Sequence, residues 1–110
     1  MPMVRRVHIV GARGDWTAEV EGRRLAVIHT CWRQGATGYH DPMEGANTTG
    51  KRYADFLNAL KSHDLVVVQR DVPGSFARDG YVGVFRFKDL AVGPKGDISL
   101  TLVERYADHK

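Results

Sequence analysis

Aromatic and cationic side chains lie next to each other at several points of this sequence, where strands are expected to end or loops to run. The aromatic residues of this kind are Trp16, Trp32, Tyr39, Phe76 and Tyr81. Arg33 follows Trp32 directly, and Arg78 lies close after Phe76. Unpaired bases of nucleic acids stack on such rings while arginine and lysine neutralise the neighbouring phosphates. The combination indicates base binding, although each ring taken alone fits core packing better.

A string from Gly45 to Lys51, GANTTGK, fits the start of the phosphate loop of nucleotide-hydrolysing enzymes. Arg52 stands where that motif has Ser or Thr, so the hydroxyl that would hold magnesium is missing. The residues before the string are polar, whereas a phosphate loop follows a buried strand, and we therefore expect no nucleotide hydrolysis. Two interpretations remain open: a phosphate-binding corner with Lys51 and Arg52, or a solvated first turn of a helix.

Four residues of metal-binding or nucleophilic types are grouped in sequence: His29, Cys31, His40 and Asp41. His29 and Cys31 would share one face of a strand, which makes a zinc site or a cysteine–histidine pair conceivable. The paired ligand spacings of structural zinc sites are absent. The sequence therefore favours a buried thiol and a core histidine, and we assign no metal, no cofactor and no catalytic residue.

The elements that must position these residues are mostly strands. Apolar patterns predict strands over residues 4–10, 16–21, 25–32, 65–69, 81–87 and 98–102. A helix is expected from about Lys51 to Lys61, with Thr48 or Thr49 as its N-cap. Its apolar face consists of Tyr53, Phe56, Leu57 and Leu60.

Turns and loops separate these elements. Residues 34–50 and 72–80 lack a hydrophobic period and are expected to form loops. Tight turns are predicted at residues 21–23 and 93–97. Gly83 lies within a predicted strand and indicates a bulge or a close backbone approach. After the last strand we expect a polar tail at Asp108 to Lys110.

This order predicts an α+β fold: a small curled β-sheet or partly closed β-barrel of five to six strands, with one main helix plugging one end. With 110 residues, of which 43% are hydrophobic, the chain is expected to form a single domain, residues 1–110. A formal charge of +3 permits contact with a polyanion, although the basic residues are scattered along the chain.

The only cysteine, Cys31, cannot form an internal disulfide, and an unpaired thiol in an apolar run is typical of a reducing compartment. The apolar stretch near Met1 is too short for a signal-peptide core or for a membrane span. We therefore predict a cytoplasmic protein without membrane contact.

The C-terminal half resembles a known superfamily. Residues 60–69, LKSHDLVVVQ, followed after a gap by residues 80–87, GYVGVFRF, are similar to the helix and two strands of PUA-like domains, which include the EVE, ASCH and SRA types. An early tryptophan, here Trp16 or Trp32, adds to the similarity. The characteristic motifs of the ASCH and SRA types are missing, so the EVE type is the most similar.

The resemblance implies a small curled barrel that binds RNA or holds a modified or flipped DNA base in an aromatic-lined pocket. It implies that Trp32, Tyr39, Asp41, Phe76 and Tyr81 line this pocket. Asp41 would accept a hydrogen bond from an exocyclic amine, which is the role of a carboxylate that faces cytosine.

The leading hypothesis is a nucleic-acid-binding module without enzymatic activity of its own, for DNA or RNA and including modified bases. Its predicted phosphate contacts are Arg33, Lys51, Arg52 and Arg78. The first alternative is a protein-interaction or phage-type structural subunit that docks through its glycine-rich loops. The second is a small enzyme with unassigned residues. A protein partner or a fused domain stays open in each case.

Overall fold

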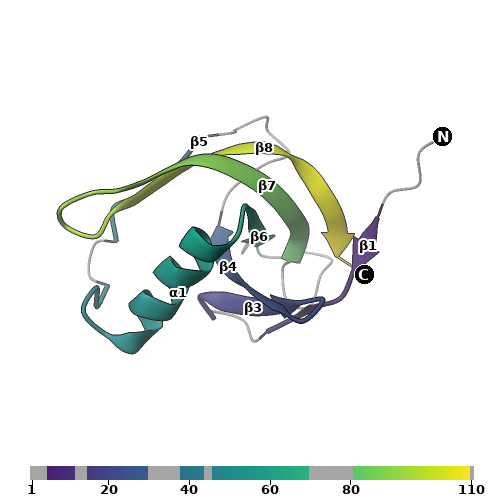
Figure 1. Ribbon diagram of the computed structural model, residues 1–110, viewed down its shortest axis with the longest axis horizontal. Coiled ribbons are helices and arrows are strands. Elements are labelled where there is room, and N and C mark those ends of the chain that lie inside the picture. The colour runs from purple at the N-terminus through teal and green to yellow at the C-terminus, as the bar shows by residue number, and fades with distance from the viewer. Residues whose placement is uncertain (1–4, 12–14, 30–37, 44–45, 70–80, 110) are drawn as a thin grey trace, which may run out of the picture.

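The computed structural model describes residues 5–11, 15–29, 38–43, 46–69 and 81–109 (Figure 1). The strands of these ranges are β1 (Arg6–Val7), β2 (Ile9–Val10), β3 (Thr17–Val20), β4 (Arg23–His29), β5 (Gly38–Asp41), β6 (Leu65–Gln69), β7 (Tyr81–Val92) and β8 (Ile98–His109). The helix is α1 (Lys51–Ser62). The chain is thus mostly β-structure with one helix across its described part.

The strands form one curled sheet in the order β1-β8-β7-β6-β4-β3-β2, and β5, which lies off this path, also pairs with β8. The two ends of this order, β1 and β2, are separated in the chain only by His8. The sheet therefore closes almost completely on itself, as a barrel (Figure 1). The pairs β1/β8 and β4/β6 are parallel, and the other pairs are antiparallel.

The prediction of a curled, partly closed barrel with one main helix is confirmed, but the predicted five to six strands are too few. Eight strands lie in the described ranges. The expected strand over residues 4–10 is interrupted at His8, where the chain passes from its pairing with β8 to its pairing with β3. The expected loop over residues 34–50 contains β5, which is held by β8.

Two clusters of buried side chains occupy opposite faces of the sheet. The barrel interior is filled from every strand except β5, by Val7, Ile9, Ala18, Val20, Leu25, Val27, Leu65, Val67, Val84 and Ala107. The second cluster lies between the sheet and α1, where Tyr53, Phe56, Ala59 and Leu60 of the helix pack on strands β4, β6, β7 and β8. Because both faces of β6 are covered, all five of its residues are buried, as expected for a strand without polar alternation.

The predicted helix is confirmed, whereas its predicted N-cap is wrong. The N-cap is Gly50, which makes no side-chain capping bond. The hydroxyl of Thr49 is engaged elsewhere, since Asn47 Oδ1 accepts hydrogen bonds from Thr49 Oγ1 at 2.9 Å and from the Thr49 amide at 3.1 Å. In the described ranges no helix is both long and apolar enough to cross a bilayer.

Both predicted tight turns are confirmed. Glu21 and Gly22 have positive φ angles of 51° and 78°, the conformation that matches a two-residue turn to the twist of a hairpin. The Gly93 amide bonds to the Asp97 carbonyl at 2.8 Å and closes the β7–β8 hairpin. The predicted polar tail is wrong at Asp108 and His109, because both residues belong to β8 and pair with β1.

Gly83 confirms the expected close approach of two backbones. A Cβ atom on this residue would lie 2.4 Å from the carbonyl oxygen of Ala107, next to a shift in the β7–β8 register at Val84 and Phe85. No real Cβ comes so near to a backbone oxygen, so any side chain here would push β7 and β8 apart at the bulge.

We therefore expect Gly83→Ala to lower the free energy of unfolding by about 1–3 kcal/mol, the usual cost of overpacking. The matched control is Gly38→Ala in β5, because a Cβ there meets no atom within 4 Å. Urea unfolding of both variants measures the difference. Equal midpoints for the two variants would show that the β7–β8 contact is looser than described.

Candidate functional site

A pocket of about 180 Å³ opens at the C-terminal end of β4. Its walls are Trp16, Val27, His29, Tyr39, Asp41, Met43, Ala46 and Phe56. These residues come from the segment before β3, from β4, from β5 with the turn after it, and from α1. The pocket is thus assembled from parts of the chain that are distant in sequence.

Two of the predicted ligand-binding residues enter the pocket from β5. Tyr39 and Asp41 are half-buried, whereas Gly38 and His40 are exposed, because side chains alternate between the faces of a strand. Pairing with β8 fixes this register, with Tyr39 opposite Leu100. The exposed His40 ring points its Nε2 at Asp97 Oδ2, 3.3 Å away in the β7–β8 turn.

Trp16 forms the aromatic wall of the pocket and is held on several sides. Its carbonyl oxygen accepts a hydrogen bond of 2.8 Å from the amide of Val27. Its ring meets Phe56 edge-on, with centroids 5.8 Å apart and an interplanar angle of 74°. The guanidinium of Arg52 lies 4.7 Å from the ring centroid, within the range of a cation–π contact.

Asp41 is the anchored polar group of the pocket. Its Oδ2 accepts a hydrogen bond of 3.2 Å from the Tyr39 hydroxyl, and its Oδ1 accepts one of 2.8 Å from the Met43 amide. Met43 has a φ of 56°, a left-handed conformation that is uncommon outside glycine. The bond from its amide to Asp41 supports this turn and fixes the carboxylate at the same time.

Burial and the neighbouring Asp41 carboxylate raise the pKa of Tyr39 well above its ordinary value, against a smaller opposing effect of a hydrogen bond from the His29 backbone. The phenol therefore keeps its proton, and its bond to Asp41, above the pH of about 10 at which an ordinary tyrosine ionises. The result is a small cavity with aromatic and apolar walls and one oriented hydrogen-bond acceptor.

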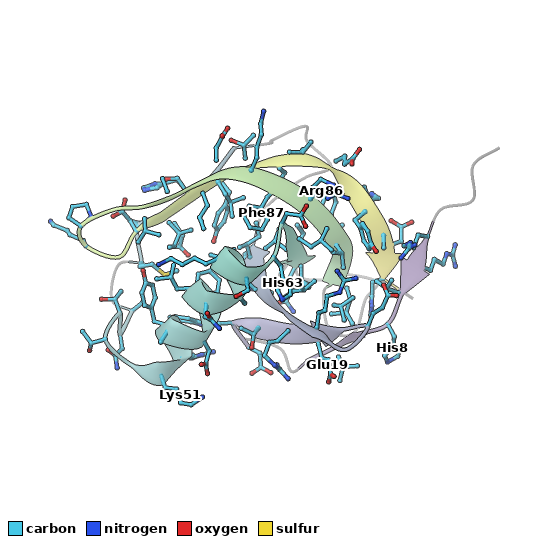
Figure 2. All side chains as sticks on the ribbon, viewed as in Figure 1. His8, Glu19, Lys51, His63, Arg86 and Phe87 are labelled. Atoms are coloured by element: carbon cyan, nitrogen blue, oxygen red, sulfur yellow. The ribbon has the colours of Figure 1, made fainter. Side chains whose placement is uncertain are left out.

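A second hollow, which we call the arginine groove, shares Trp16 with the pocket. It has a volume of about 220 Å³ and is lined by Asp15, Trp16, Thr17, Arg24, Arg52 and Asp55. Arg24 Nη1 donates a hydrogen bond of 3.3 Å to Thr17 Oγ1 across the β3–β4 hairpin. Lys51, one turn before Asp55 in α1, pairs with its carboxylate at 2.7 Å and is 88% exposed (Figure 2).

The structure thus brings Trp16, Tyr39 and Asp41 into one pocket and places Arg52 beside it. The other predicted phosphate contact in the described ranges, Lys51, is largely exposed and pairs with Asp55. Tyr81 begins β7, where its backbone pairs with Gln69. Four predicted site residues lie outside the described residues: Trp32, Arg33, Phe76 and Arg78.

Several residues that line the two hollows were not predicted from the sequence as site residues. Phe56 was expected only as a core residue of the helix. Met43 belongs to residues 34–50, which lack a hydrophobic period. Arg24 and Thr17 become neighbours only through the β3–β4 register, in which Arg24 lies opposite Glu19. The hairpin turn itself was predictable, so a count back from the turn would have placed Arg24 and Thr17 on the same face.

Among the residues that the structure describes, no three histidine, cysteine or acidic side chains lie close enough to hold a metal ion. His29 and Asp41 line the same pocket, whereas Cys31 lies outside the described ranges. Comparisons with protein-family models, with curated proteins and with solved structures found no match for this chain. The pocket and the arginine groove are therefore the features of this chain that bear on its function.

The raised pKa of Tyr39 can be measured by alkaline titration of phenolate absorbance. An ordinary tyrosine ionises near pH 10, so Tyr39→Phe should leave the absorbance that develops between about pH 9 and pH 11 unchanged. In the unfolded chain Tyr39 loses its proton at a lower pH than in the folded chain. Stability should therefore fall as the pH rises above about 10, and less steeply in the variant. A smaller absorbance change between about pH 9 and pH 11 in the variant than in the wild type would refute the burial of this hydroxyl beside Asp41.

Proposed function

We propose that this chain is a PUA-like nucleic-acid-binding module, without enzymatic activity of its own, that takes one unpaired base into the pocket at Trp16. The observation that carries the proposal is the meeting of Trp16, Tyr39 and Asp41 in one small cavity. An aromatic wall beside a fixed polar group is the combination by which proteins read the edge of an unstacked base.

The size of the pocket supports a single ring as its occupant. Pockets for drug-sized ligands measure roughly 300–1,000 Å³, whereas this one measures about 180 Å³. Stacking of one base on an aromatic side chain contributes about 1–3 kcal/mol. Trp16 offers a large ring for this contact, and its contacts with Phe56 and Arg52 hold the ring in place before any ligand arrives.

The carboxylate of Asp41 supports a preference for bases that carry an exocyclic amine. Its two oxygens already accept bonds from Tyr39 and Met43, yet each carboxylate oxygen has capacity for more than one donor. The amine of cytosine donates to such a group, whereas thymine and uracil present a carbonyl oxygen at the same place. Cytosine combines the amine with the smaller ring, so we propose cytosine, ordinary or modified, as the preferred base.

The test is binding of single-stranded oligonucleotides, measured by fluorescence anisotropy. We expect wild-type protein to bind an oligocytidine more tightly than an oligothymidine of equal length. Affinity should fall as salt rises, because phosphate contacts release counterions. Asp41→Asn should reduce the preference for cytosine by about tenfold or more, since a hydrogen bond to a charged acceptor contributes about 1.5–3 kcal/mol.

The matched control is Asp89→Asn, which removes the same charge from an exposed position of β7 whose φ of 58° suits asparagine. It should keep the preference for cytosine. If the folded wild-type protein binds no oligonucleotide at low salt, the proposal is wrong, and concentration-dependent self-assembly would then favour a structural subunit. An equal loss of preference in both aspartate variants would likewise exclude Asp41 as the residue that reads the base.

A further inference from the structure

The arginine groove contains two guanidinium groups that do not line the pocket itself. Arg24 comes from β4 and Arg52 from α1, so the groove lies between the sheet and the first turns of the helix. Trp16 lines both hollows. A molecule in the pocket and a molecule in the groove would therefore touch the same indole ring.

The groove carries charges of both signs. Its lining holds two arginines and the carboxylates of Asp15 and Asp55, of which Asp55 pairs with Lys51 at 2.7 Å. Glu19 lies opposite Arg24 in the β3–β4 register, so cations and carboxylates are equal in number here when Lys51 and Glu19 are included. The carboxylates still repel a free anion, so a phosphate is expected to bind well only when another part of the same molecule is anchored nearby.

The donors in the groove have the chemistry that recognises phosphate. A guanidinium presents five N–H donors in its plane, and the guanidinium of Arg52 lies beside the ring of Trp16. Arg24 is oriented by its bond to Thr17 Oγ1. The same hydroxyl can donate its own hydrogen to a phosphate oxygen, because Arg24 occupies only its acceptor side.

We propose that the arginine groove binds a phosphate of the nucleotide whose base lies in the pocket, with Arg24, Arg52 and Thr17 as its contacts. This inference rests on the proposed function. The recognised unit is then a nucleotide and not a nucleoside. The base lies against Trp16 on the pocket side, and the sugar passes the indole ring that the two hollows share. Binding of the base supplies the anchor that the mixed charge of the groove demands.

The test is calorimetric titration of the full chain with cytidine and with its 5′- and 3′-monophosphates. We expect one of the monophosphates to bind about tenfold more tightly than cytidine, as a charge-assisted contact predicts. Arg24→Gln and Arg52→Gln should each bring the affinity ratio of monophosphate to cytidine close to one. The ratio in wild type should also shrink at high salt.

The matched control is Arg6→Gln, an exposed arginine of β1, which lies far from the start of α1 (Figure 1). It should keep the wild-type ratio. Arg24→Lys, which retains the charge without the planar fork, should keep part of the advantage.

The outcomes separate the two proposals. If cytidine binds and both monophosphates bind no better, the groove is not a phosphate site, while base recognition in the pocket stands. The same conclusion follows if the advantage survives in both arginine-to-glutamine variants. If the folded protein binds neither cytidine nor its monophosphates and binds no oligonucleotide, the proposal of base recognition is wrong. The phosphate site, which depends on a bound base, is then wrong as well.

Discussion

The parallel pairing of β4 with β6 determines how the rest of this chain is arranged. Neighbouring parallel strands cannot be joined by a tight turn and need a crossover of about a dozen residues or more. Here the chain between His29 and Leu65 makes that crossover, and it carries both β5 and α1. Tyr39 and Asp41 on β5 and Phe56 on α1 therefore arrive together at the C-terminal end of β4.

The crossover between β4 and β6 also makes the pocket depend on the packing of the core. Phe56 is 2% exposed and belongs to the core between α1 and the sheet, yet it also forms part of the pocket wall. Trp16 is only partly buried and packs against this core through Phe56. Any change that loosens α1 from β4 would thus open the pocket and release Trp16 at once, so binding depends on the packing of the helix.

The parts of the fold that local patterns specify could be predicted from the sequence. The apolar face of α1 follows from its spacing, the β3–β4 turn from Gly22, and the bulge from Gly83, because each depends on residues close in the chain. Strand β5 could not be predicted in this way. Its sequence, Gly-Tyr-His-Asp, has no apolar alternation, and it is held by pairing with β8, far away in the chain.

The candidate site was predictable to a similar extent. Tyr39 and Asp41 were expected in one pocket through a family resemblance, and their alternate positions on β5 explain why both face it. The arginine groove was not foreseen. Arg24 and Arg52 are distant in sequence and meet only because α1 packs over the β3–β4 hairpin. Their closeness depends on tertiary packing, which cannot be predicted from local patterns in the sequence.

The most direct test of the account is a ¹H–¹⁵N NMR titration of the full chain with a short single-stranded oligocytidine. Two N–H groups report on the pocket: the indole Nε1–H of Trp16 and the amide of Met43, which donates to Asp41. We expect both resonances to shift and to saturate together at one equivalent of ligand. Shifts confined to other parts of the molecule, or no shift at saturating ligand, would contradict the claim that the pocket at Trp16 receives a base.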